Sequence, residues 1–215
     1  MSLHPDMLPH PNKARPNRTI LITAGVVVAV LAAMALDTTV VRIGSDADVR
    51  AAKFSPEAFG AETFPKVQAN ITRRAVDAVE LATAIATDPK AAEAKYSVAG
   101  VYSVKLEGTV GEGKSGIYYV DVAGISAPLR LRVQTGPAIN GTELRDATGE
   151  ISFSQFTNQI EYQDAGSALN KEMKKLVLNG VDNSALTGKT LAVVGAFRLV
   201  NPKSWLITPV SLEVK

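Results

Sequence analysis

One uncharged apolar segment near the N-terminus constrains this chain more than any other feature. Residues 19–36, TILITAGVVVAVLAAMAL, contain no charged side chain. As a helix the segment would measure about 27 Å, roughly the thickness of a membrane's hydrocarbon core. Lys13, Arg15 and Arg18 precede it, and a basic flank of this kind keeps the N-terminus inside and sends the following chain across. The segment therefore predicts a cytoplasmic leader at residues 1–18 and an exported remainder.

The same segment is compatible with two fates. If it is retained, it is a signal-anchor, a single-pass transmembrane helix that holds an extracytoplasmic C-terminal domain at the cell membrane. If it is a signal peptide, the small residues Ala33 and Ala35 supply a cleavage pattern, and the domain is secreted after cleavage near Ala35. The long proline-containing leader and the length of the segment favour retention. A buried core helix is disfavoured, because such helices rarely lack a polar face.

The composition excludes several kinds of chemistry. The chain has no cysteine, which excludes disulfides, thiolate nucleophiles and cysteine-ligated metals. Its two histidines, His4 and His10, lie in the leader, so the exported part has no imidazole for a catalytic triad or a metal. We therefore expect no enzymatic activity, no cofactor and no metal. A net charge of +2, dispersed along the chain, also argues against nucleic acid as a partner.

The first half of the exported part is predicted to be linker and helix. Residues 37–55 have the character of a linker, with one short strand at 38–43. Ser55 as N-cap and Pro56 at the first helical position predict a helix start. A longer amphipathic helix is predicted from about 65 to 87, and a short one then begins at Asp88-Pro89 and runs to about 95. Residues 56–95 thus form a predicted helical segment packed on the following domain.

Residues 96–215 are predicted to form that domain, a small closed barrel, because short alternating strands recur with turn signals between them. In the strand at 129–134, Leu131 and Val133 face inward while Arg130 and Arg132 face outward. The overall fold class is mainly β with helices (α+β). The predicted elements are strands at 96–109, 117–122, 129–134, 149–162 (with a bulge near 154–155), 188–199 and 206–214, a turn at 111–114, and a helix at 164–181 capped by Gly180.

Several short strings in the chain resemble the DUF2291 family, whose members are described as predicted periplasmic lipoproteins. The resemblance covers residues 40–215, and its most specific piece is the string TGPAING. The strings are Gly44-Ser45-Asp46, Phe59-Gly60, Gly113-Lys114-Ser115-Gly116, Thr135-Gly136-Pro137-Ala138-Ile139-Asn140-Gly141-Thr142, Phe156-Thr157-Asn158-Gln159 and Asn201-Pro202-Lys203.

The resemblance implies an OB-like β-barrel with N-terminal helical decoration, to which the apolar segment at 19–36 adds one N-terminal transmembrane helix. It also implies genes that often neighbour sugar ABC transporters of the ribose type, and it carries no catalytic residue over to this chain. One feature departs from the lipoprotein description. Leu36-Asp37 stands about where an acylated cysteine would be, so lipid anchoring is excluded here and an uncleaved helix is the expected substitute.

The loop at 136–146 is the first candidate binding site. Asn140, Thr142, Arg145 and Asp146 offer amide, hydroxyl, guanidinium and carboxylate groups, which are directional hydrogen-bond partners of the kind that carbohydrate recognition uses. The alternative is a long structural turn, in which Asn-Gly supplies the bend and Arg145 pairs with Asp146 or another acid.

The second candidate site is residues 156–164, FTNQIEYQD. Asn158 falls on the phase of the apolar residues, so we expect it either to brace the barrel or to meet a ligand together with Glu161 and Tyr162. Glu161 and Asp164 could form a carboxylate pair of the glycosidase kind, which is disfavoured because nothing in the sequence points to a raised pKa. Trp205, the only tryptophan, is interpreted as a core residue.

These observations predict a non-enzymatic extracytoplasmic membrane-associated protein. The favoured hypothesis is an accessory of a sugar ABC transporter that touches the permease or the solute-binding protein, or that holds a sugar ligand. The transporter link rests on the family resemblance alone. Two alternatives stay open: a carboxylate-dependent hydrolase acting on a glycan or cell-wall polymer, and a purely structural envelope tether.

Overall fold

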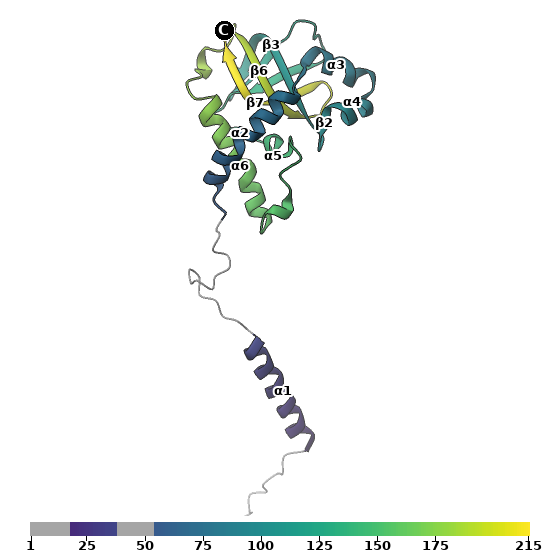
Figure 1. Ribbon diagram of the computed structural model, residues 1–215, viewed down its shortest axis with the longest axis vertical. Helices are drawn as coiled ribbons and strands as arrows, with labels where there is room; N and C mark the ends of the chain where they lie inside the picture. Colours follow the sequence, from purple (N-terminus) through teal and green to yellow (C-terminus); the bar gives the residue numbers. More distant parts are fainter. Residues whose placement is uncertain (1–17, 38–53) are drawn as a thin grey trace, which may run out of the picture. The chain divides into compact units, whose positions relative to one another are not determined.

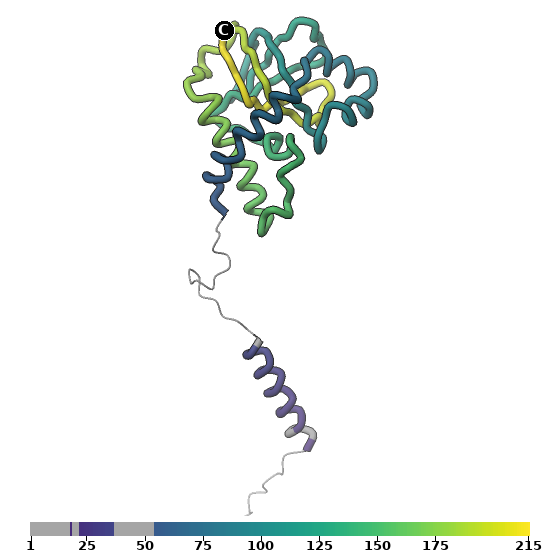
Figure 2. Tube along the Cα trace, in the orientation of Figure 1, coloured from purple at the N-terminus to yellow at the C-terminus, as the bar shows by residue number. Residues whose placement is uncertain are grey.

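The structure is a computed structural model that describes residues 18–37 and 54–215 (Figure 1). Contacts divide the chain into two units, residues 1–53 and residues 54–215. The short strand expected at 38–43 lies outside the described residues, as does nearly all of the expected linker. In the first unit the described part is one helix, α1, Arg18–Asp37 (Figure 2).

The apolar segment is helical, as the prediction of a transmembrane helix at 19–36 requires. Nevertheless, within the part of the chain that the structure describes, no helix combines the length and the apolar character that a membrane crossing demands.

The helical segment of the second unit differs from the prediction in where it breaks. The first helix does not end before Pro65 but runs through it, and the chain bends instead at residues 75–77. Asp77 causes this break, because its Oδ1 accepts hydrogen bonds from the amides of Val79 and Glu80 and so caps a new helix. The start at Ser55 and the junction at Asp88 are confirmed. The elements are α2 Pro56–Arg74, β1 Val76–Asp77, α3 Ala78–Thr87 and α4 Pro89–Tyr96.

Five strands close into a ring. In spatial order they run β3-β4-β5-β7-β6, and β6 pairs with β3 to complete the circuit. All neighbours are antiparallel except β5 and β7, which are parallel. The predicted barrel is thus present as a large mixed sheet. The bounds are β2 Ser97–Val98, β3 Val101–Lys114, β4 Ile117–Asp121, β5 Arg130–Gln134, β6 Thr190–Arg198 and β7 Ser204–Val214.

Two predictions within the barrel need correction. The turn expected at 111–114 is part of β3, and the chain reverses at Ser115 and Gly116, which both have positive φ. The strand expected at 149–162 is absent. Its place is taken by a 3-10 turn and the start of a helix, because Asn158 and Glu161 are helix-capping residues. The helices here are α5 Glu143–Asp146, η2 Phe153–Gln155, α6 Gln159–Val177 and η3 Asn183–Ala185.

The core has two parts. Inside the ring, α3 packs against inward strand residues, and Trp205 stacks on Phe197, which stacks on Tyr102. The interpretation of Trp205 as a core residue is confirmed, and so is the inward direction of Leu131 and Val133.

Outside the ring, α2 and α6 lie side by side and cover strands β6 and β7 (Figure 1). The two helices approach closely at Gly60, where a Cβ atom would lie 2.8 Å from the carbonyl oxygen of Ala168. This contact fixes the position of α6, on whose polar face the candidate site lies.

Candidate functional site

A cavity of about 370 Å³ lies between residues 139–141 and α6, and is called here the polar cavity. It is an open depression, and most of its lining side chains end in amide, hydroxyl or ammonium groups. The lining residues are Ile139, Asn140, Gly141, Ser167, Asn170, Lys171 and Lys174.

The loop that forms one wall of the polar cavity is held through its backbone. The buried side chain of Gln134, at the end of β5, accepts a hydrogen bond from the backbone N–H of Asn140 (3.0 Å) and donates one to the backbone carbonyl of Asn140 (3.0 Å). It also donates to Thr208 Oγ1 (2.8 Å). Asn170 Nδ2 donates to the carbonyl of Gly141 (2.9 Å). The Asn140 side chain is exposed and makes no hydrogen bond within the described residues. The fold therefore fixes the loop and leaves this amide available.

Two ammonium groups, those of Lys171 and Lys174, line the polar cavity. Lys174 Nζ donates to the carbonyl of Pro137 (2.6 Å), which uses one of its three protons. Lys171 Nζ donates to Glu57 Oε1 (2.7 Å), and this hydrogen bond together with the carboxylate charge raises the Lys171 pKa. No carboxylate belongs to the lining residues. The cavity can thus offer several hydrogen-bond donors to a ligand rich in oxygen atoms.

A second cavity, about 650 Å³, adjoins the first along α2 and α6 and shares Ser167 and Lys171 with it. It contains three carboxylates, from Glu57, Asp164 and Glu172. The hydrogen bond and positive charge of Lys171 lower the Glu57 pKa, and Glu172 pairs with Lys175 (3.1 Å). A glycosidase acid needs the opposite, a raised pKa.

The other predicted residues of the loop form an internal network. Asp146 accepts hydrogen bonds from Thr142 Oγ1, Arg145 Nε and Arg198 Nη2, each at 2.8 Å. Arg145 is buried and also donates to the carbonyl of Tyr162 (3.1 Å). Its guanidinium carbon lies 3.7 Å from the centre of the Tyr162 ring. The Asp146 network therefore joins α5 to β6 and to α6.

Asn158 and Glu161 have reciprocal capping roles at the start of α6. Asn158 Oδ1 accepts from the Glu161 amide (2.9 Å), and Glu161 Oε2 accepts from the Thr157 amide (2.9 Å). The pair resembles a capping box, displaced by one residue at its second bond. The expectation that Asn158 lies buried on a strand is wrong, since it is an exposed N-cap.

The seven predicted site residues thus fall into three groups. Asn140 alone borders the polar cavity. Thr142, Arg145, Asp146 and Tyr162 meet in the Asp146 network, and Asn158 and Glu161 cap α6. The expected pairing of Arg145 with Asp146 is observed, whereas a ligand-binding role for any of the seven stays a prediction. Sequence reasoning missed Ser167, Asn170, Lys171 and Lys174. They occupy the polar face of a correctly expected helix, and such a face is usually only solvated. No sequence signal pairs it with residues 139–141.

One partly buried acid, Glu143, lies outside both cavities. Desolvation raises the pKa of Glu143 on α5, and the nearby positive charge of Arg198 only partly opposes this. Its Oε2 is buried without a hydrogen-bond partner. Among the described residues, no group of three or more acidic or histidine side chains is arranged to hold a metal ion.

The barrel and its covering helices define a mixed α+β domain of the OB-fold kind. The structure of an OB-fold protein from Thermotoga maritima matches it with a TM-score of 0.60 and 22% sequence identity, over 75% of this chain and 99% of that chain. At this identity the likeness shows the fold alone. No curated protein matches the chain.

The chain belongs to the DUF2291 family, described as predicted periplasmic lipoproteins, whose profile matches residues 26–213. The family description implies membrane attachment and an extracytoplasmic location. It shows no partner and no activity.

Proposed function

We propose that this protein is a non-enzymatic, membrane-attached accessory of a sugar ABC transporter, and that its polar cavity binds a sugar. The observation that carries the proposal is the polar cavity itself. There the side-chain amide of Asn140 is unpartnered within the described residues while the backbone around it is fixed, and Ser167, Asn170 and two lysines complete a set of polar groups. Preorganised polar groups of this kind fix the orientation of a ligand's hydroxyl groups. The proposed association with a sugar transporter rests on the family resemblance.

The absence of enzymatic activity is part of the proposal. The polar cavity lacks a carboxylate, and in the adjoining cavity Lys171 lowers the Glu57 pKa. The acid with the raised pKa, Glu143, belongs to neither cavity. A hydrolase of the glycosidase kind needs one such acid opposite a second carboxylate in one cleft. The hydrolase alternative therefore receives no support from this geometry.

Attachment through residues 19–36 is also proposed. Large apolar side chains cover α1 and are exposed, and exposed apolar surface of this extent marks a membrane or protein contact. The chain has no cysteine that could carry a lipid in place of this helix. The exposed residues are Ile22, Val26, Val27, Val28, Val30, Leu31, Met34 and Leu36.

Sugar binding is tested by titration calorimetry of the detergent-solubilised full chain with D-ribose, D-glucose and D-galactose. We expect one of them to bind, and the double variant Asn140→Ala/Ser167→Ala to weaken it at least tenfold. Asn179→Ala is the matched control, because it removes an exposed amide outside the polar cavity. Absence of binding by all three sugars, or equal loss in the control, would overturn the cavity assignment.

The transporter role is tested by affinity purification of the chain from membranes, followed by mass spectrometry of bait and partners. Recovery of a sugar permease or a solute-binding protein, with the peptide of residues 19–36 intact on the bait, supports the accessory role. A bait that begins near Leu36 and carries no partner would contradict both attachment and the transporter role. An intact bait without partners would favour the structural tether.

A further inference from the structure

Five aromatic rings meet at one end of the domain and form what we call the aromatic tip: Phe54, Phe59, Phe153, Phe156 and Tyr162. Each ring contacts at least one other with centroids 5.3–5.7 Å apart, in tilted or edge-on arrangements. The tip holds four of the six phenylalanines of the chain. It draws on three parts of the sequence, the start of α2, η2 and the start of α6.

The aromatic tip is not an ordinary core. None of its five rings is fully buried, whereas Phe64 and Phe197, the remaining phenylalanines, are 0% exposed. Phe153 is 49% exposed, and Ile160, between Phe156 and Tyr162 in the sequence, is 70% exposed. A cluster with this much apolar surface in water calls for a contact that covers it.

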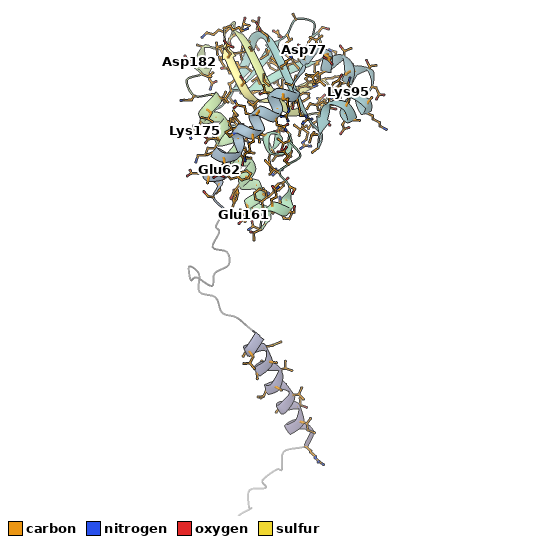
Figure 3. All side chains as sticks on the ribbon, in the orientation of Figure 1. Glu62, Asp77, Lys95, Glu161, Lys175 and Asp182 are labelled. Carbon is orange, nitrogen blue, oxygen red and sulfur yellow. The ribbon has the colours of Figure 1, made fainter. Side chains whose placement is uncertain are left out.

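The path of the chain points to the contact. Phe54 is the first described residue of the domain and belongs to the aromatic tip. Only sixteen residues, 38–53, join it to α1, a length that reaches at most about 55 Å when fully extended. The aromatic tip is therefore at the place where the chain from the attached helix enters the domain. In Figure 3 the label of Glu161 marks this end, and that of Asp182 lies toward the opposite end.

We propose that the aromatic tip rests in the headgroup region of the lipid bilayer and sets the orientation of the domain. This inference rests on the proposed attachment through residues 19–36. Aromatic rings favour the membrane–water interface, where an apolar body and a wet edge are both accommodated. Tyr162 is stacked on the Arg145 guanidinium, which is itself bound to Asp146, so the tip is braced against the rest of the domain. A helix plus a second, weaker membrane contact restricts the domain more than a helix alone.

The absence of native cysteine makes the test direct, because one introduced cysteine can be labelled selectively. The full-length chain carrying Ile160→Cys is labelled with the environment-sensitive fluorophore NBD and reconstituted into phosphatidylcholine vesicles with and without nitroxide-labelled lipid. Asp182→Cys, exposed and at the other end, is the matched control. We expect lipid quenching at least twofold stronger at residue 160 than at residue 182, with a blue-shifted emission.

A second variant isolates the rings. Adding Phe153→Ser to the Ile160→Cys background should reduce the quenching toward the control value without altering the melting temperature by more than a few degrees. Co-flotation with the vesicles reports on the attachment separately. Chain that floats but quenches equally at 160 and 182 overturns the inference and leaves the attachment standing. If the chain does not float with the vesicles, both the inference and the attachment are overturned. If residue 160 shows no lipid quenching and Phe153→Ser loses a co-purifying protein, the aromatic tip is the contact surface for that protein instead.

Discussion

The Asp146 network and the polar cavity are built from the same loop, yet the polar side chains are paired within the protein in the first and left unpaired at Asn140 in the second. In the network each group has partners within the protein. Asp146 accepts three hydrogen bonds, and Arg145 contacts the Asp146 carboxylate, the Tyr162 carbonyl and the Tyr162 ring. At the polar cavity, a few residues earlier, the backbone of Asn140 is held by Gln134 while its side chain is left without a partner.

The difference shows that polar residue types alone do not mark a binding site. A buried charge needs hydrogen-bond partners from the protein itself. The charged groups of this loop, Arg145 and Asp146, are therefore already engaged in contacts within the domain. The side-chain amide of Asn140 is exposed to water, so leaving it without a protein partner carries no desolvation cost. It is therefore available to a ligand. The predictions that follow test this contrast from its strongest consequence to its weakest.

Asp146→Ala should produce the largest effect. Its removal leaves buried Arg145 and its neighbour Arg198 without their shared carboxylate, so we expect the free energy of unfolding to fall by about 3 kcal/mol. Urea denaturation of the full chain in mild detergent measures it. Asn140→Ala is the internal comparison and should stay within about 0.5 kcal/mol of the parent. Equal losses in the two variants would remove the distinction between network and cavity.

Gly60→Leu should be next. A side chain there meets the Ala168 carbonyl at 2.8 Å, so α6 must move away, at a cost of about 2 kcal/mol. Because α6 carries four of the polar side chains that line the polar cavity, sugar binding should weaken as well. Ala61→Leu, at an exposed neighbouring position of α2, serves as the control and should leave the melting temperature nearly unchanged. A stable Gly60→Leu protein would show that the helices are not in close contact.

Asn158→Ala removes the N-cap of α6 and should cost about 1 kcal/mol. Asn158→Asp retains an acceptor oxygen and should restore most of the loss. Combined with Glu161→Ala, the double variant should lose less than the sum of the single losses, because both side chains stabilise the same first turn. Strict additivity in thermal unfolding would contradict shared capping, and reduced sugar affinity in Asn158→Ala would return the residue to the binding site.

Glu143→Gln should produce the smallest change in the free energy of unfolding. At neutral pH this variant should be stabilised, whereas the variants above are destabilised. Burial raises the Glu143 pKa, so the folded state holds the proton more tightly than the unfolded state. Stability from this group is present at low pH and is lost as pH rises above about 4.3 through the folded-state pKa. Charges of Arg198 and Asp146 act on it in opposite directions. The variant should therefore be slightly more stable than the parent at pH 7 and indistinguishable from it at pH 4, as measured by thermal unfolding.

Much of the fold could be predicted from short-range signals. Alternation placed Leu131 and Val133 inside the barrel, and Asp88-Pro89 marked a helix junction correctly. The errors arise where one residue type has two uses. Asp77 lies inside the helix predicted from about 65 to 87 but is an N-cap, and Asn158 lies inside the strand predicted at 149–162 but is also an N-cap. The candidate site was less predictable, because the polar cavity forms only when residues 139–141 meet a helix face that begins about twenty-six residues later in the chain, at Ser167.

The closed ring of strands has a consequence for how a partner can be recognised. β4, β5 and β6 are each paired on both sides along most of their length, so within the described residues these three strands offer little free backbone edge to an incoming peptide. Strand addition, which reads mainly backbone and tolerates varied sequences, is therefore disfavoured on them. A protein that docks on these strands must read mainly side chains, and its choice of partner can then be redirected by single substitutions on the surface.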